Sequence, residues 1–225
     1  LSNLEYLEEC NGKTFKQLPE VLSPLRIRRF SQTQIMCFVI DYRSPNKLKY
    51  DLFRRLNTGG KPLNNQEIRN CLSRPPLQKA LKEMVNSEQF KKATDNSVKD
   101  NRMDAQESAL RFMYFYDQYN EDNVLGDYLG NMDSALDEYV EKINRQTNFQ
   151  NYISSYLQSL SDAFSLFGKY AFRKVYTEYE NSRRNQVNKL LMMTICVLLA
   201  KYRGSYKNGI EQKKDLTPAL ARLIK

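Results

Sequence analysis

The chain contains no histidine among its 225 residues, and this absence excludes more chemistry than any other property of the sequence. Without an imidazole, the chain cannot carry a Ser-His-Asp or Cys-His catalytic site, or a zinc site of the HExxH type. A reaction at a site built from this chain alone would have to use carboxylates, lysine, arginine, tyrosine, backbone amides or a hard metal ion. Tryptophan is absent as well, although 15 tyrosines and 11 phenylalanines supply enough aromatic side chains for a core.

Cysteines are few and are not spaced as metal ligands. The four residues are Cys10, Cys37, Cys71 and Cys196, and no two of them form a CxxC pair. A zinc site is therefore not expected, and no other metal site is predicted. Cys37 and Cys196 stand in apolar runs and are expected to be buried. Reduced cysteines favour a cytoplasmic location.

Long apolar runs are also lacking. The most apolar segment, "LLMMTICVLLA" at residues 190–200, is much shorter than the about 20 residues of a membrane span. It predicts a buried helix over roughly residues 185–202, and no membrane partner is expected. Because the sequence starts at Leu1 and not at a methionine, we expect it to be part of a longer gene product.

The net charge of +9 favours a partner that carries phosphate, such as a nucleotide or DNA. A lysine-rich surface that only keeps the protein soluble is the other interpretation. The segment "RKVYTEYENSRRNQVNK" concentrates this charge, and its basic residues form either a solvated face or a track for nucleic acid. The candidates for such a track are Arg173, Lys174, Arg183 and Arg184.

The apolar pattern predicts an α+β chain that is predominantly helical. Residues 35–40, "IMCFVI", form a continuous apolar run that ends at Asp41, which is typical of a strand covered on both faces. One strand cannot form a sheet, so we expect partners elsewhere. We predict a single domain, with a small mixed part over residues 1–75 and a helical part over residues 76–225.

Two helices are expected around the glycine pair Gly59-Gly60. The first ends at this pair and carries an apolar stripe. The second should start at Asn64, because Glu67 stands three residues later, which is the spacing of a capping box. The stripe of the first helix is Leu48, Leu52, Phe53 and Leu56, and that of the second is Ile68, Cys71 and Leu72.

Apolar residues recur at helical spacing through most of the remaining chain. The segment "RFMYFYDQY" interleaves aromatic and charged residues, which either pack in a core or stack on bases. Core packing is the favoured interpretation. Neighbouring carboxylates such as Asp137 and Glu138 have no partner in the sequence that would predict a hydrolytic pair.

The glycine pair leaves two interpretations open. It forms only a helix end and a turn, or its backbone amides bind an anion with help from nearby arginines. The pattern matches neither a GxxxxGK[ST] loop nor a GxGxxG loop. Arg69 is equally ambiguous, because it could pair with Asp51 or Glu67 or reach a phosphate.

The segment "FRRLNTGGKPLNNQEIRN" resembles a motif of the N-terminal domain of GmrSD-type modification-dependent restriction endonucleases, a family with a ParB/sulfiredoxin-like fold. The segments "LFGKYAFRKV" and "NKLLMMTICVLLAKY" are similar to the closing helices of that family, and the likeness covers most of the chain. The matching motif residues are Phe53, Arg55, Leu56, Asn57, Gly59, Gly60, Leu63, Glu67, Arg69 and Asn70.

The resemblance implies a nucleotide-responsive regulatory domain in phage defence, with a nucleoside triphosphate and a divalent metal as the implied ligands. It implies a catalytic role for Asn57, which would orient a water molecule or a phosphate oxygen. Arg55, Gly59, Gly60 and Arg69 would bind the nucleotide phosphates, and Phe53, Glu67 and Asn70 would support them.

One motif of the family is missing here. No DGQQR segment occurs in the sequence, so we expect the chain by itself to be inactive as an enzyme. The nuclease of the family uses histidine, and it is therefore expected on another domain or subunit. A DNA-binding module with a basic helical face, and a helical scaffold for a partner nuclease, are the alternative functions.

Overall fold

The computed structural model describes residues 2, 4–37, 39, 41, 43–44, 46–56, 62–119, 128, 130–175, 186–212 and 214–223, with the side chains of 46, 47 and 56 left aside. The chain divides into two compact units, Leu1–Ser44 and Pro45–Lys225. The boundary expected near residue 75 falls inside the second unit, between α3 (Asn65–Leu72) and α4 (Pro75–Asn86).

The first unit contains only short helices among its described residues. The 3-10 helices η1 (Glu8–Cys10) and η2 (Phe15–Glu20) precede α1 (Pro24–Ser31). Gly12 follows η1 with a φ of 76°, a conformation that glycine adopts without strain.

The strand predicted at residues 35–40 is wrong for the part of this run that the structure describes. Ile35, Met36 and Val39 have no strand structure and are 83%, 82% and 91% exposed. Cys37 is exposed as well, against the prediction that it is buried. No described residue of the chain belongs to a strand, and the closest feature is an isolated bridge between Arg173 and Val187. The described part therefore does not support the remnant of a mixed sheet, because the run has no partner strand to satisfy its backbone.

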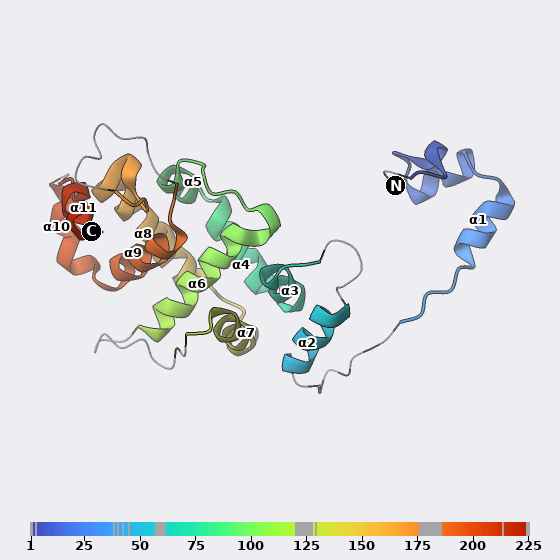
Figure 1. Cartoon of the computed structure of the whole chain (residues 1–225), viewed down its shortest axis with the longest axis horizontal. Coiled ribbons are helices and arrows are strands. Elements are labelled where there is room, and N and C mark those ends of the chain that lie inside the picture. Colours follow the sequence, from blue (N-terminus) through green and yellow to red (C-terminus); the bar gives the residue numbers. More distant parts are fainter. Residues whose placement is uncertain are drawn as a thin grey trace. The chain divides into compact units, whose positions relative to one another are not determined.

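The second unit is an assembly of helices, labelled in Figure 1. They are α2 (Asn46–Leu56), α3 (Asn65–Leu72), α4 (Pro75–Asn86), α5 (Glu88–Thr94), η3 (Asn101–Met103), α6 (Asp104–Gln118), α7 (Met132–Ile143), α8 (Gln150–Phe167), η4 (Gly168–Tyr170), α9 (Lys189–Lys201), α10 (Arg203–Glu211) and α11 (Thr217–Leu223). The chain is therefore predominantly helical, as predicted. Helix α9 agrees with the helix expected at residues 185–202, whereas α10 and α11 were not expected.

The core lies where α4, α5, α6, α8 and α9 pack against one another (Figure 1). The aromatic segment of α6 provides much of it, because Phe112 is fully buried and its ring lies 4.8 Å from that of Tyr156 on α8. Tyr114 and Phe115 are buried too, so core packing is confirmed for this part of the segment. Cys196 is buried in α9, as predicted.

Helix α7 packs on α6 and α3 through Leu136, Tyr139, Val140 and Ile143, which are buried as the apolar pattern predicts. The side chain of Asn144, just after α7, connects it to the turn between α3 and α4. Its Oδ1 accepts a hydrogen bond from the Arg74 amide at 2.7 Å, and its Nδ2 donates to the Leu72 carbonyl at 3.1 Å. These contacts place α3 beside α7.

The buried faces of α2 and α3 differ from the predicted stripes. In α2, Tyr50 is buried, whereas Leu48 is 44% exposed and Leu52 and Phe53 are half-buried. In α3, Ile68 is buried as predicted, but Cys71 is exposed. The buried polar residues of α3 are Gln66 and Arg69. The spacing of apolar residues does not predict that these two side chains are buried.

Among the helices that the structure describes, none combines the length and the apolar character that a membrane crossing requires.

Candidate functional site around Arg69

Helix α3 begins with the predicted capping box, which the structure confirms. The Asn64 Oδ1 accepts a hydrogen bond from the Glu67 amide at 2.8 Å, and the Glu67 Oε2 accepts one from the Asn64 amide at 2.7 Å. Both bonds satisfy amides that the helix itself leaves without a partner. This cap determines where the second half of the "FRRLNTGGKPLNNQEIRN" segment turns into a helix.

Arg102 holds the chain that leads into this cap. It donates hydrogen bonds to Glu67 Oε2 at 2.7 Å and to the Pro62 carbonyl, while its own carbonyl accepts one from Asn64 Nδ2 at 2.8 Å. The hydrogen bond to Glu67 raises the pKa of Arg102 above its ordinary value. Residues 62–67 are therefore tied to the segment just before α6 by contacts at both the backbone and the side chains.

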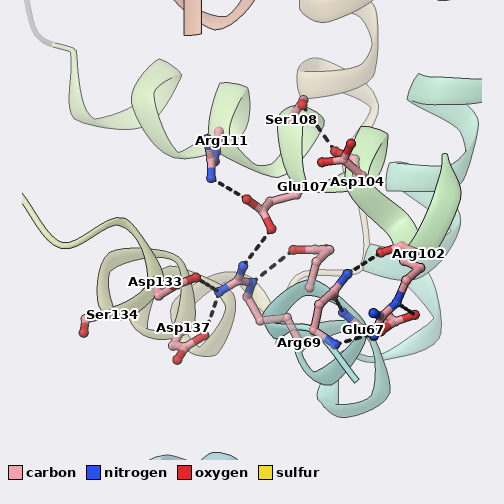
Figure 2. Close-up of polar contacts among 12 residues, drawn as sticks. Glu67, Arg69, Arg102, Asp104, Glu107, Ser108, Arg111, Asp133, Ser134 and Asp137 are labelled. Atoms are coloured by element: carbon pink, nitrogen blue, oxygen red, sulfur yellow. Dashed lines mark hydrogen bonds and ion pairs between the residues drawn. The ribbon is translucent and has the colours of Figure 1, made fainter. Parts of the chain in front are cut away.

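Arg69, on α3, has the largest fully buried side chain among the described residues and no exposed surface. Figure 2 shows its guanidinium between Glu107 of α6 and two carboxylates of α7. Its Nη1 lies 3.2 Å from Asp133 and 3.1 Å from Asp137, and its Nη2 lies 3.3 Å from Glu107. The partners are thus neither Asp51 nor Glu67, which the sequence left open as partners beside a phosphate.

The remaining donors and acceptors of this cluster are also largely paired. The Arg69 Nε donates to the Oε1 of Gln66 at 3.0 Å. Arg111 forms an ion pair with Glu107, and Arg54 of α2 forms one with Asp137 at 2.8 Å. Three guanidinium groups (54, 69 and 111) therefore meet three carboxylates (107, 133 and 137), so their formal charges cancel. A buried charge needs such compensation, because its desolvation is costly.

Asp137 connects the two helices on either side of the glycine pair. Its Oδ2 accepts a hydrogen bond from Arg54 of α2 at 2.8 Å, and its Oδ1 accepts one from Arg69 of α3 at 3.1 Å. A single carboxylate on α7 thus fixes both flanks of the motif.

Tyr50 is the buried aromatic residue of this region. Burial raises its pKa to about 12, and the negative charges of Asp137 and Glu141 add to this effect. The phenol is therefore neutral at physiological pH, and the side chain lies 5% exposed between α2 and α7.

The other predicted site residues lie in different settings. Asn57, Gly59 and Gly60 are outside the described residues, and so is Lys61. Arg55 is exposed at the end of α2, and Phe53 is half-buried. Asn70 is half-buried on α3, and its enclosed side-chain oxygen has no hydrogen-bond partner among the described residues. The roles assigned to these residues in binding a nucleotide stay predictions.

Of the basic candidates at residues 173–184, the structure describes Arg173 and Lys174. Arg173 is 5% exposed and donates hydrogen bonds to the backbone carbonyls of Lys169 and Thr94 at 3.2 and 3.4 Å. Lys174 is exposed, whereas Arg183 and Arg184 lie outside the described residues. Arg173 is therefore a helix-connecting residue in this structure, and its role in nucleic-acid binding stays a prediction.

Sequence proximity to Arg69 did not reveal the partners that build this site, namely Arg102, Glu107, Asp133 and Asp137. Asp133 and Asp137 are four residues apart, a spacing that places both on one face of a helix. This spacing is visible in the sequence, but it indicates an ion-pair site only once Arg69 is known to lie opposite the two carboxylates. Among the described residues, no three cysteine or carboxylate side chains lie close enough to hold a metal ion together.

Comparison of the chain with protein-family models, with curated proteins and with solved structures gives no match.

Proposed function

We propose that this chain is a nucleotide-responsive regulatory domain of a phage-defence, modification-dependent restriction system. In this proposal the segment between α2 and α3, together with Arg55, binds the phosphates of a nucleotide, and Asn57 orients a phosphate oxygen or a water molecule. The resemblance of residues 53–70 to the GmrSD-type motif supplies the class of ligand. A partner domain or subunit would supply the nuclease.

The observation that carries the proposal is that the Asp137 carboxylate accepts hydrogen bonds from both Arg54 and Arg69. Both ends of the glycine segment are connected to α7 through this carboxylate, and Arg102 holds Pro62 and Glu67 on the side of α3. A loop whose ends are held in place loses less conformational entropy when it binds a ligand. This is the property that a phosphate-binding loop made of backbone amides needs.

The same contacts divide the arginines of the motif into two groups. Arg69 has no exposed surface and is surrounded by carboxylates, so it positions the loop and leaves no guanidinium edge for a phosphate. Arg55 is exposed at the end of α2, next to residues 57–61. Arg55 is thus the described cation best placed to neutralise phosphate charge in this proposal.

The test is nucleotide binding by the whole chain, with fluorescent ATP and GTP analogues and Mg²⁺. We expect binding of one of these nucleotides, and a loss of about tenfold in Arg55→Ala because one charge-assisted contact disappears. Arg145→Ala removes an exposed arginine just after α7 and serves as the matched control, with no more than about a twofold change. Failure of both analogues to bind, or equal losses in the two variants, would refute the proposal.

Hydrolysis is a separate measurement. Because the DGQQR-type segment is missing from this sequence, we expect the bound triphosphate to remain intact over the time in which binding equilibrates. Rapid turnover by the purified chain would show that the assignment of the missing segment to catalysis is wrong.

A further inference from the structure

A cavity of about 130 Å³ lies between α2 and α7, and its electrostatic character is opposite to that of the whole chain. The chain carries a net charge of +9, yet the cavity is lined by four carboxylates and one guanidinium, that of Arg54. A phosphate would be repelled here, whereas a cation would be attracted. The carboxylates are those of Asp51, Asp137, Glu138 and Glu141.

Three of these carboxylates have no partner of their own among the described residues. Asp137 is engaged by Arg54 and Arg69, but no described lysine or arginine forms an ion pair with Asp51, Glu138 or Glu141. The lining of the cavity therefore carries a net negative charge, part of which faces water at the exposed Glu138 and Glu141.

Tyr50 provides a second and independent indication of a ligand. Its side chain is 5% exposed, it lines the cavity, and its hydroxyl forms no hydrogen bond with any described residue. The hydroxyl is not among the polar atoms sealed from solvent, so it stays accessible from the cavity. No described residue bonds this accessible hydroxyl, and a ligand in the cavity would provide a partner for it.

A larger groove between α6 and α7 lies next to the cavity. That groove has a volume of about 390 Å³ and shares Ser134 and Glu138 with the cavity. Tyr114 and Tyr139 form its aromatic wall, and their rings lie 5.4 Å apart in an edge-on arrangement. A ligand whose charged end fills the small cavity would thus extend over an amphipathic groove.

We propose that the cavity between α2 and α7 binds the guanidinium group of an arginine on a partner protein, and that the residue next to this arginine lies in the groove between α6 and α7. Arginine fits better than lysine, because its planar fork pairs with carboxylates and stacks on aromatic rings. A metal ion is a poorer fit, since no three carboxylates among the described residues converge closely enough to bind one. A free small cation would fill the cavity and leave the adjoining groove unused.

Arg54 and Asp137 line the cavity and also hold the helices on either side of the glycine segment. The inference is therefore tested through Tyr50, Glu138 and Glu141, which have no role in the nucleotide proposal. It concerns the acidic side of α7, whereas the phosphate proposal concerns residues 55–61. Loss of one activity would therefore leave the other measurable.

The experiment uses the whole chain and a fluorescein-labelled peptide with the sequence Gly-Gly-Arg-Tyr-Gly, followed by fluorescence anisotropy. The same peptide with citrulline in place of arginine keeps the shape but lacks the charge. We expect binding of the arginine peptide and at least about tenfold weaker binding of the citrulline peptide, because charge-assisted hydrogen bonds are lost. Equal binding of the two peptides would overturn the proposal.

Protein variants locate the contact. Glu138→Gln with Glu141→Gln removes two exposed carboxylates of the cavity, and we expect about tenfold weaker binding of the arginine peptide. The matched control, Glu83→Gln with Glu88→Gln, removes two exposed carboxylates from α4 and α5 and should leave the affinity unchanged. Equal losses in the two double variants would mean that only net charge matters, which would refute the assigned site.

Tyr50→Phe removes the hydroxyl and keeps the packing of the ring. We expect this variant to bind the arginine peptide at least about threefold more weakly. Circular dichroism checks that each variant is folded. Competition with N-acetylarginine amide separates the two sources of a guanidinium. A partner segment predicts that this small molecule competes at least about tenfold less well than the unlabelled peptide, whereas equal competition would overturn the choice of a protein partner.

Discussion

Replacing Arg69 by methionine tests the central physical claim, that one buried guanidinium holds α3 to α6 and α7. Methionine has a similar length and fits a buried position, so the change removes the charge and the hydrogen bonds while preserving much of the volume. Arg69→Met leaves Glu107, Asp133 and Asp137 without their shared partner.

The expected loss follows from the geometry. Removing one partner of a buried ion pair typically costs about 3–5 kcal/mol, because the remaining charge stays buried without compensation. Here Asp133 is half exposed and Glu107 and Asp137 keep Arg111 and Arg54, so part of the penalty is relieved by water and by these arginines. We therefore expect the free energy of unfolding to fall by about 3 kcal/mol, the lower end of that range.

Urea denaturation followed by circular dichroism measures this loss. Arg111→Met is the matched control, because it removes a partly exposed arginine that pairs with Glu107 four residues away on the same helix. Such a pair contributes about 0.3–0.5 kcal/mol. If Arg69→Met cost less than about 1 kcal/mol, or no more than Arg111→Met, the buried network would not be the element that joins these helices.

Two further predictions concern the cap of α3 and the buried tyrosines. Glu67→Ala removes the capping-box acceptor and the ion pair with Arg102, and thermal unfolding should show a loss of about 1–2 kcal/mol. Glu67→Gln keeps an acceptor and should lose less, so equal losses would contradict the capping role. Burial raises the pKa of Tyr50 to about 12, while an unfolded tyrosine titrates near 10. The folded state therefore binds the phenol proton more tightly than the unfolded state. The contribution of Tyr50 to the free energy of unfolding is complete below about pH 10 and is lost between pH 10 and about 12. Tyr139, Tyr156 and Tyr206 have raised pKa values for the same reason, so urea denaturation at increasing pH should show this decline, and constant stability up to pH 12 would refute it.

The sequence alone predicted the local features that depend on neighbouring residues. The capping box at Asn64 and Glu67, the buried helix of residues 189–201 and the apolar faces of α6, α7 and α8 follow from side-chain spacing along a helix. A period of three to four residues reports a helix irrespective of what the helix packs against. For this reason the predominantly helical character was predicted correctly.

The strand at residues 35–40 shows the limit of that reasoning. A short apolar run is compatible with a strand, but a strand also requires a partner whose backbone groups it can bond. The described residues of the first unit provide none, and Ile35, Met36 and Val39 are exposed. Partner availability is not a property of the run itself, so its composition could not decide the outcome.

Only the tertiary structure decided the environment of Arg69. The acidic residues near it in the sequence are Glu67 and Asp51. The carboxylates that bind it instead come from α6 and α7, 38 to 68 residues away. The folded chain places three acids around a side chain with no exposed surface, and Arg54 joins α2 to one of these acids, Asp137. Local spacing specifies which residues share a helix face, because that depends on the backbone period. Which faces meet, and therefore which charges compensate each other, depends on packing over the whole unit.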